Sequence, residues 1–283
     1  WFGVTVGNGR VTNLTLAENG LTGDIPQDLT TLSELNTADL SNNSLTRLPN
    51  LVTISTLTDL DVTGNNLQFG DIERNQNITT FNYQNQGPFG EVQEAPILIR
   101  RGGRFVIRSQ ARGSANRYSW SRVNANGTTE VSTGPTVDIN GIDFGNMGTF
   151  TLTVTSDVIT DLTITSNPFE VFATAILNGA INGIGSAPLD NGIVHAISIP
   201  FDGSLYDSLA QQTVSNGAFS FDELILGNYL LGTEADPTIY FPTYLSNSIG
   251  WIDADTVFFR DDASVDNYQM QELLEDLPPF PEG

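Results

Sequence analysis

A short pattern of apolar residues and one amide recurs over the first 86 residues. The pattern reads leucine, any residue, leucine, two residues, asparagine, one residue, leucine. The first copy runs from Leu14 to Leu21, and later copies have other apolar residues at some leucine positions. The copies begin at Leu14, Ala38, Leu60 and, in degenerate form, Phe81, so the successive spacings are 24, 22 and 21 residues. A period in this range predicts one short strand per coil, with buried apolar side chains and an asparagine that bonds the backbone of the turn. Such coils stack as a solenoid.

The pattern resembles the leucine-rich repeat family. Its first copy continues with Gly23-Asp24-Ile25-Pro26, the Gly-x-Ile-Pro extension of one variety of that family. The opening residues Trp1 to Val6 resemble the cap of plant receptor proteins, except that Val6 stands where those proteins carry a cysteine. This departure favours a bacterial relative. The resemblance covers residues 1–86 and implies that function lies on a surface and not in a pocket.

A different pattern follows between residues 87 and 172. Short alternating segments separated by Gly and Asn turns predict the strands of a two-sheet sandwich. The segment is similar to immunoglobulin-like domains, because Trp120 stands at the place of their core tryptophan and residues 146–152 match their corner motif, with Phe150 in place of tyrosine. The resemblance implies that Ile107 and Leu152 replace the usual disulfide pair, since the chain has no cysteine.

The third segment, residues 173–272, resembles carboxypeptidase-regulatory-like and collagen-adhesin B-type sandwiches. The resemblance is carried by a Gly-x-Ile strand at Gly179, a Gly-x-Phe-x-Phe hairpin at Gly217 and a Gly-x-Tyr strand at Gly227. The acidic, proline-rich residues 273–283 are expected to be a linker. The predicted fold class is therefore mainly β: a short leucine-rich-repeat solenoid (1–86) followed by two β-sandwich domains (87–172 and 173–272).

Composition excludes several classes of function. The net charge is -22 and all eleven cations are arginine, so long-range repulsion argues against binding nucleic acid or anionic membranes. The absence of cysteine removes thiolate nucleophiles and thiolate metal sites. No segment has the roughly 20 apolar residues that a membrane span needs. Because Trp1 is not a translation start, we expect the chain to be a piece of a longer protein.

The predicted solenoid places polar residues on one face. Residues that flank the buried leucines alternate to the other side of each strand and form two rows across the coils. The candidate ligand-binding residues are Asn13, Thr37, Asp59 and Thr80 in one row, and Thr15, Asp39, Asp61 and Asn82 in the other. Two carboxylates about 5 Å apart repel by roughly 0.8 kcal/mol in water, which a bound cation or a basic side chain reverses. The rows indicate a recognition face for a basic or hydroxyl-rich ligand, or else a merely solvated surface.

A second group of acids lies near the end of the chain. Five aspartates offer carboxylate oxygens of the kind that calcium prefers, which makes calcium the candidate cofactor. They are Asp253, Asp255, Asp261, Asp262 and Asp266. The spacing lacks the loop of an EF-hand, so a solvated edge is the competing interpretation.

Seven of the eleven arginines fall within 23 residues. They are Arg100, Arg101, Arg104, Arg108, Arg112, Arg117 and Arg122. Guanidinium groups in such a series can dock a neighbouring acidic module or an anionic glycan. Internal neutralisation is the favoured alternative, because the flanking segments are themselves acidic.

Signals of catalysis are missing from the sequence. His195 is the only histidine, and its strand parity with Ile193, Ile197 and Ile199 predicts a partly buried ring with one local hydrogen bond. A serine triad would need this histidine and a nucleophile elbow that the chain lacks. Glycosidase chemistry needs two carboxylates in a cleft, which small solenoid and sandwich modules disfavour. The chain is expected not to be an enzyme.

Short motifs favour export. Asp207-Ser208-Leu209 and Asp255-Thr256-Val257 are similar to O-glycosylation sites of secreted Bacteroidetes proteins, and four asparagines head N-x-S/T sequons: Asn13, Asn42, Asn77 and Asn126. We therefore expect an extracellular, non-catalytic adhesion or assembly segment of a larger bacterial cell-surface or secreted protein, with a protein or glycan partner and neighbouring modules of the same protein. The alternatives are accessory modules of a secreted hydrolase, and spacer modules of an extracellular filament or stalk.

Overall fold

The structure is a computed structural model that describes residues 2–199 and 209–271. It divides into two compact units. The first comprises Trp1–Pro96, Val106–Asp138 and Gly148–Glu170, and the second comprises Ile97–Phe105, Ile139–Met147 and Val171–Gly283. The expected linker at 273–283 and the motif residues 207 and 208 lie outside the described residues. The boundaries of the three modules stay a prediction.

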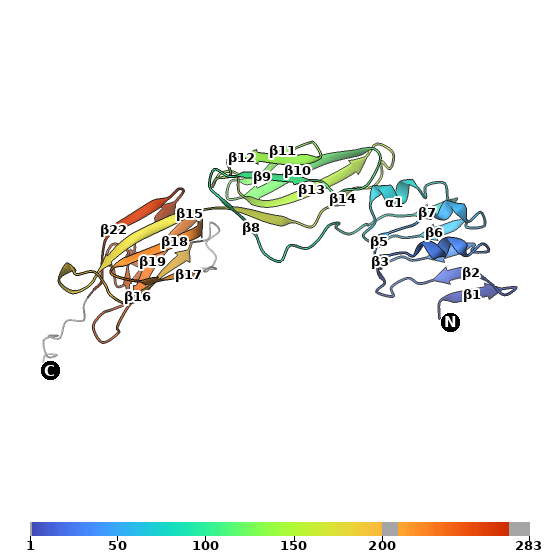
Figure 1. Cartoon of the computed structure of the whole chain (residues 1–283). Helices are drawn as coiled ribbons and strands as arrows, with labels where there is room; N and C mark the ends of the chain where they lie inside the picture. Colours follow the sequence, from blue (N-terminus) through green and yellow to red (C-terminus); the bar gives the residue numbers. More distant parts are fainter. Residues whose placement is uncertain (1, 200–208, 272–283) are drawn as a thin grey trace, which may run out of the picture. The chain divides into compact units, whose positions relative to one another are not determined.

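The first unit opens with a solenoid of parallel strands (Figure 1, blue to cyan). Strand β1 (Val4–Gly7) pairs antiparallel with β2 (Arg10–Thr15), and the parallel strands β4 (Thr37–Asp39), β6 (Asp59–Asp61) and β7 (Thr80–Asn82) follow at one strand per coil. The returning segments hold the parallel pair β3 (Thr22–Asp24) and β5 (Ser44–Arg47), the 3-10 helices η1 (Gln27–Thr31) and η2 (Leu51–Thr53), and helix α1 (Phe69–Glu73).

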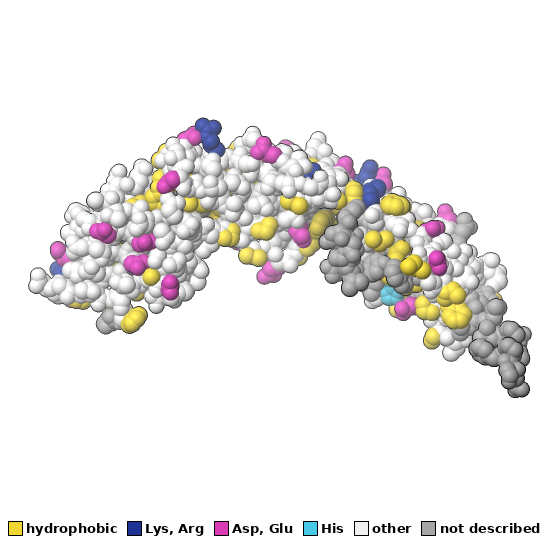
Figure 2. Space-filling model, turned by 180° about the vertical axis from the view of Figure 1, so that it is seen from behind, with side chains coloured by type: hydrophobic (Ala, Val, Ile, Leu, Met, Phe, Trp, Pro, Cys, Tyr) yellow, Lys and Arg dark blue, Asp and Glu magenta, His cyan; other side chains and the backbone are white. Residues whose placement is uncertain are grey.

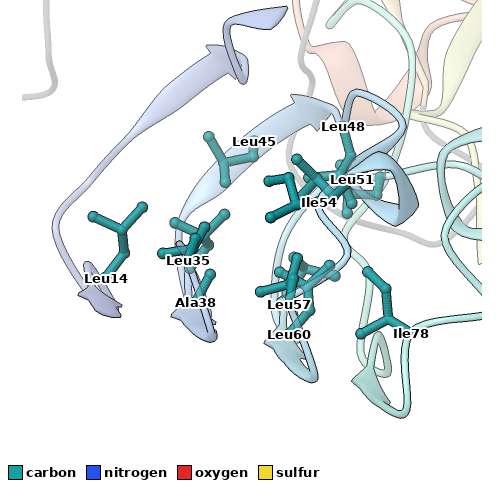
Figure 3. Close-up of a cluster of buried hydrophobic side chains, with 13 residues drawn as sticks. Leu14, Leu35, Ala38, Leu45, Leu48, Leu51, Ile54, Leu57, Leu60 and Ile78 are labelled. Carbon is teal, nitrogen blue, oxygen red and sulfur yellow. The ribbon is translucent and has the colours of Figure 1, made fainter. Parts of the chain in front are cut away.

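The leucines of the repeat pattern fill one shared core. Leu14, Leu40 and Leu60 are 7%, 1% and 1% exposed, and Leu16 packs against the same cluster. Figure 3 shows Leu14, Ala38 and Leu60 on successive coils, pointing into the same interior. The predicted stacked coil is confirmed, because each coil buries its apolar side chains against its neighbours.

The repeated asparagines hold neighbouring coils together. The Oδ1 atom of Asn43 accepts hydrogen bonds from the backbone N–H groups of Asn19 and Leu21 in the preceding coil, while its amide nitrogen donates to three backbone carbonyls. Asn65 is 1% exposed and bonds the backbone in the same way one coil later. Gln86 fills the equivalent position of the degenerate fourth copy. Buried backbone groups that would otherwise lack partners are thereby satisfied.

The rest of the first unit contains the core of the predicted immunoglobulin-like sandwich. Strand β10 (Asn116–Asn124) pairs antiparallel with β11 (Gly127–Ser132) and β13 (Gly148–Ser156), and β13 pairs with β14 (Ile164–Thr165). Trp120 is 2% exposed and stands opposite Leu152 in the register, and Phe150 stacks on Phe169 with ring centroids 5.7 Å apart. Strands β9 (Arg104–Arg108) and β12 (Thr136–Asn140) form a separate pair, in which Ile107 is half-buried.

Two sheets build the second unit. Strand β15 (Phe169–Asn182), which belongs to both units, pairs antiparallel with β18 (Ala218–Ile225) and parallel with β22 (Ala263–Gln269) and β8 (Ile97–Arg100). The other sheet has β17 (Leu209–Val214), β16 (Gly192–Ser198) and β19 (Gly227–Glu234), with β20 (Thr243–Tyr244) and β21 (Val257–Phe259) both paired to β19. Short 3-10 helices lie at η3 (Ile184–Ser186) and η4 (Trp251–Asp253).

The interior of the second unit is apolar, with one tyrosine hydroxyl tied to the backbone. Leu177, Val194 and Leu231 have no measurable exposure. The Tyr268 hydroxyl, which has one proton to donate, lies 2.5 Å from the carbonyl oxygen of Thr243 and 3.1 Å from that of Leu231, and burial raises the pKa of this phenol. The described chain is thus mainly β, a leucine-rich-repeat solenoid followed by β-sandwich structure, as the sequence predicts.

Candidate functional site

The strands of the solenoid bring all eight predicted ligand-binding residues onto one face. Pairing of β2, β4, β6 and β7 aligns Asn13, Thr37, Asp59 and Thr80 in one row, and Thr15, Asp39, Asp61 and Asn82 in the other. Neighbouring strands in a sheet lie about 4.8 Å apart, so side chains in each row are within reach of one another. We call this surface of eight residues the repeat face.

Hydrogen bonds link neighbouring members of the repeat face. Asn13 Nδ2 donates to Thr37 Oγ1 at 2.6 Å, and Asn82 Nδ2 donates to Asp61 Oδ2 at 3.2 Å. Asp59 Oδ2 accepts from the hydroxyl of the adjacent Thr58 at 2.6 Å. The side chains are therefore ordered relative to one another before any ligand arrives.

Two of the aspartates also hold the turn that follows their strand. Asp39 Oδ1 accepts from the backbone N–H and the hydroxyl of Ser41, at 3.0 and 2.7 Å. Asp61 Oδ1 accepts from the same two groups of Thr63, at 2.9 and 2.7 Å. An aspartate with a serine or threonine two residues later favours this local turn, so the sequence did contain the signal. The Oδ1 atoms of Asp39 and Asp61 are thus structural. On the repeat face, Asp39 Oδ2 and Asp59 Oδ1 have no hydrogen bond inside the described chain.

The repeat face is hollowed only slightly. A depression of about 200 Å³ is lined by Thr37, Asp59, Thr80 and their neighbours. Sites for drug-sized ligands usually measure about 300–1,000 Å³. The depression therefore suits one side chain of a protein partner or one sugar unit, with the surrounding strands supplying further contacts.

The carboxylates of the repeat face have no basic partner in the part of the chain that the structure describes. Within the described ranges, no arginine lies within ion-pair distance of Asp39, Asp59 or Asp61. On the surface that Figure 2 shows, acidic side chains are more numerous than basic ones. A cation or a basic side chain brought by a partner would relieve this local repulsion.

The five aspartates of the predicted calcium site are not gathered into a ligand set. Arg100 Nη2 instead lies 2.8 Å from each carboxylate oxygen of Asp262, and Asp261 pairs with Arg101 at 3.0 Å. The N–H of Ile176, followed by the charges of Arg100 and Arg101, lowers the pKa of Asp262. Among residues 2–199 and 209–271, no three His, Cys, Asp or Glu side chains are grouped to hold a metal ion. Two of the five aspartates are thus paired with arginine, and calcium binding by the group stays a prediction.

The arginine series is largely used inside the molecule. Besides the two pairs just described, Arg117 pairs with Asp157, and Arg112 pairs with Asp71. These ion pairs agree with internal neutralisation, the alternative that the acidic flanks favoured. Each arginine meets an aspartate far away in sequence, which is why spacing alone did not identify the partners.

His195 differs from the prediction in one respect. Its side chain is 15% exposed, as expected for a partly buried ring, but neither ring nitrogen has a hydrogen-bond partner in the described part of the chain. The nearest carboxylate oxygen, Oε2 of Glu234, is 3.7 Å from Nε2. The predicted local hydrogen bond is therefore wrong, because the atoms beside the ring on β19 and β20 do not reach it.

Helices of the described part do not meet the length and apolarity that crossing a bilayer requires. The geometry defines a class of protein: a mainly β chain that combines a leucine-rich-repeat solenoid with sandwich structure and displays an acidic strand face. No family model matches the chain.

Comparison with curated proteins gives a partial match. A segment of 67 residues is 37% identical to the receptor-like kinase TMK4 of Arabidopsis thaliana, and it represents 23% of this chain and 7% of the kinase. The matched part is thus less than a tenth of that relative's length, so the activity of the kinase says nothing about this chain.

Solved structures with some similarity include immunoglobulin domains 1–5 of Sidekick-1, at 11% identity and a TM-score of 0.31, covering 68% of this chain and 38% of that one. The internalin-like protein lmo2027 of Listeria monocytogenes has 18% identity and a TM-score of 0.27, covering 56% and 57%. BcpA, the major pilin subunit of Bacillus cereus, has 9% identity and a TM-score of 0.26, covering 63% and 67%. Scores this low carry no argument about function.

Proposed function

We propose that this chain is a non-catalytic, extracellular adhesion or assembly segment of a larger bacterial cell-surface or secreted protein. Its modules would span residues 1–86, 87–172 and 173–272, and the repeat face would bind a protein or glycan at the cell surface. The observation that carries the proposal is the repeat face itself: three carboxylates held in register on neighbouring strands, with no cation paired to them in the described chain.

The chemistry of this face favours a partner with basic or hydroxyl groups. Asp39 Oδ2 and Asp59 Oδ1 are acceptors without donors, and Thr15 and Thr80 add exposed hydroxyls. Charge-assisted hydrogen bonds from arginine or lysine to carboxylates are about twice as strong as neutral ones. Sugar hydroxyls use the same acceptors without the ionic contribution.

A binding screen tests the proposal. Wild-type protein and the triple variant D39N/D59N/D61N are applied to immobilised glycans and to separated cell-surface proteins. We expect binding by the wild type and a marked loss in the variant, in which Asn keeps the Oδ1 acceptor for the turn while the charge is removed. Salt then distinguishes the partners, because screening weakens binding to a basic protein more than binding to a neutral glycan. Equal binding by both proteins would rule out the repeat face.

A spacer role in a filament or stalk is the second candidate, and the ion pairs within each unit favour it. Arg112 with Asp71 in the first unit, and Arg100 with Asp262 in the second, join segments distant in sequence and stiffen each unit. Under this alternative the repeat face would bind no ligand, and the binding screen would find none.

A further inference from the structure

A small cavity lies on the second unit, away from the repeat face. Strand β16 turns Val194 and Ala196 into the core, so His195 and Ile197 point to the opposite side of the sheet. There the cavity has a volume of about 150 Å³ and is bounded by His195, Ile197, Glu234, Pro242 and Tyr244. A cavity of about this volume, engineered in another protein, holds a benzene molecule. The space therefore suits one planar group.

The shape of the cavity follows from one row of residues across three strands. His195 on β16 stands opposite Gly232 on β19, and Gly232 stands opposite Tyr244 on β20. Because glycine has no side chain, the phenol ring of Tyr244 packs closely over this position, with the imidazole on the other neighbouring strand. We call the cavity beside these two rings the notch. A Cβ atom added to Gly232 would lie 3.1 Å from Tyr244 Cε1, so any other residue would narrow this notch. The backbone of Gly232 and the rings of His195 and Tyr244 thus bound the notch.

The imidazole of His195 has no hydrogen-bond partner among the residues that the structure describes. Both of its ring nitrogens are shielded from solvent and make no hydrogen bond within residues 2–199 and 209–271. A neutral imidazole has one donor and one acceptor nitrogen, and buried groups of this kind are nearly always paired. Glu234 lies two residues beyond Gly232 on the same strand, and its carboxylate is 64% exposed beside the ring. In the described ranges, Glu234 has no arginine partner.

Charge decides which ligand fits these groups. Residues 173–283 contain sixteen acids and one arginine, so the potential around the cavity favours a cation. Figure 2 shows the cyan imidazole at the surface, next to acidic and apolar side chains. A planar cation would pair with the Glu234 carboxylate, donate to the acceptor nitrogen of His195 and pack against the Tyr244 ring. We propose that this notch binds a guanidinium group, such as the arginine side chain of a protein partner.

The test uses His195 as its own reporter. The chain has a single histidine, so its imidazole signals in an NMR spectrum need no assignment. Methylguanidinium chloride is titrated into a solution of the protein at pH 8, where an ordinary imidazole is neutral. Sodium chloride at the same concentrations serves as the blank. We expect a saturable shift of the ring signals with a Kd of about 1 mM or tighter.

Two variants and one control make the result decisive. Glu234→Gln should weaken binding at least about tenfold, because the ion pair is lost while the side chain keeps its shape. Gly232→Ala should weaken it as well by narrowing the notch. Glu223→Gln, the same change at an exposed glutamate of β18, should have no effect. The proposal is overturned by a flat titration, by equal binding in Glu234→Gln, or by a response to a neutral monosaccharide in place of the cation.

Discussion

Arg112 forms an ion pair with Asp71, a carboxylate that is only 2% exposed, through an Nη2 to Oδ2 distance of 2.5 Å. Asp71 belongs to helix α1 of the last coils of the solenoid, and Arg112 precedes strand β10 of the sandwich. Backbone bonds reinforce the pair, since Gly70 donates to the Arg112 carbonyl and the Arg112 N–H donates to Gln68 Oε1. The first unit is therefore one body at this point and not two modules on a free linker.

Breaking this pair should destabilise the first unit. Arg112→Ala leaves Asp71 buried without its counter-charge, and removing one partner of a buried ion pair typically costs about 3–5 kcal/mol. We expect the urea midpoint of the variant to fall accordingly when unfolding is followed by tryptophan fluorescence, because Trp120 reports on the sandwich core. Arg117→Ala is the matched control, since both members of the pair Arg117 and Asp157 are exposed. Similar losses in the two variants would contradict the special role of Arg112.

The repeated asparagines should contribute unequally to the stability of the solenoid. Asn65→Ala leaves buried backbone groups of two coils unpaired, and each such group costs about 1–3 kcal/mol. Asn19 has the same place in the first copy, but it is exposed and its amide nitrogen bonds only Ala17. We therefore expect Asn65→Ala to lower the free energy of unfolding by about 2–4 kcal/mol, and Asn19→Ala by much less. Hydrogen exchange at Leu45, which loses its acceptor in Asn65→Ala, provides the local measurement. Equal stability of the two variants would contradict the bonding scheme.

Stability of the second unit should depend on pH through Asp262. The hydrogen bond from the Ile176 N–H and the charge of Arg100 lower the pKa of this carboxyl in the folded state. A lowered folded-state pKa adds stability above the unfolded value of about 3.9, and this stability is lost as the pH falls through the folded value. Asp262→Asn should therefore melt below wild type at pH 7, and the gap should narrow at pH 3.

Asp266→Asn is the control for this pH effect, since Asp266 is exposed on β22, the strand that follows Asp262, and has no arginine partner in the described chain. Melting curves of the three proteins at pH 7, 5 and 3 provide the measurement. A difference between wild type and Asp262→Asn that is independent of pH would show that the pairing with Arg100 is not the cause.

The sequence predicted the solenoid and its face because both follow from local periodicity. A period of 21 to 24 residues sets which strands are neighbours, and the alternation within each strand then places Asp39 beside Asp61. The buried positions of Trp120 and Leu152 were predicted from the resemblance to immunoglobulin-like domains. By contrast, Arg112 and Asp71 are 41 residues apart and belong to no repeat, so nothing local indicates that they meet.

The ion pairs of Asp261 and Asp262 show the limit of composition as a guide. Asp261 and Asp262 are acidic neighbours, as a metal site requires, but the fold brings Arg100 and Arg101 to them from 160 residues away or more. Ion-pairing and metal-binding carboxylates look alike in sequence, since only the three-dimensional arrangement selects the cation. The notch at Gly232 was missed for the same reason, because it depends on the register of three strands.

The central claim is that the charge on the repeat face drives recognition. It is tested most directly by measuring the affinities of two triple variants, equal in net charge, for the partner found in the binding screen. D39N/D59N/D61N removes the charges of the repeat face, while E18Q/D28N/E34Q removes three from exposed positions elsewhere on the solenoid. We predict that the first variant weakens the affinity at least about tenfold, or 1.4 kcal/mol, and that the second leaves it within about twofold of wild type. An equal loss in both variants would mean that only the net charge matters, which would contradict the claim.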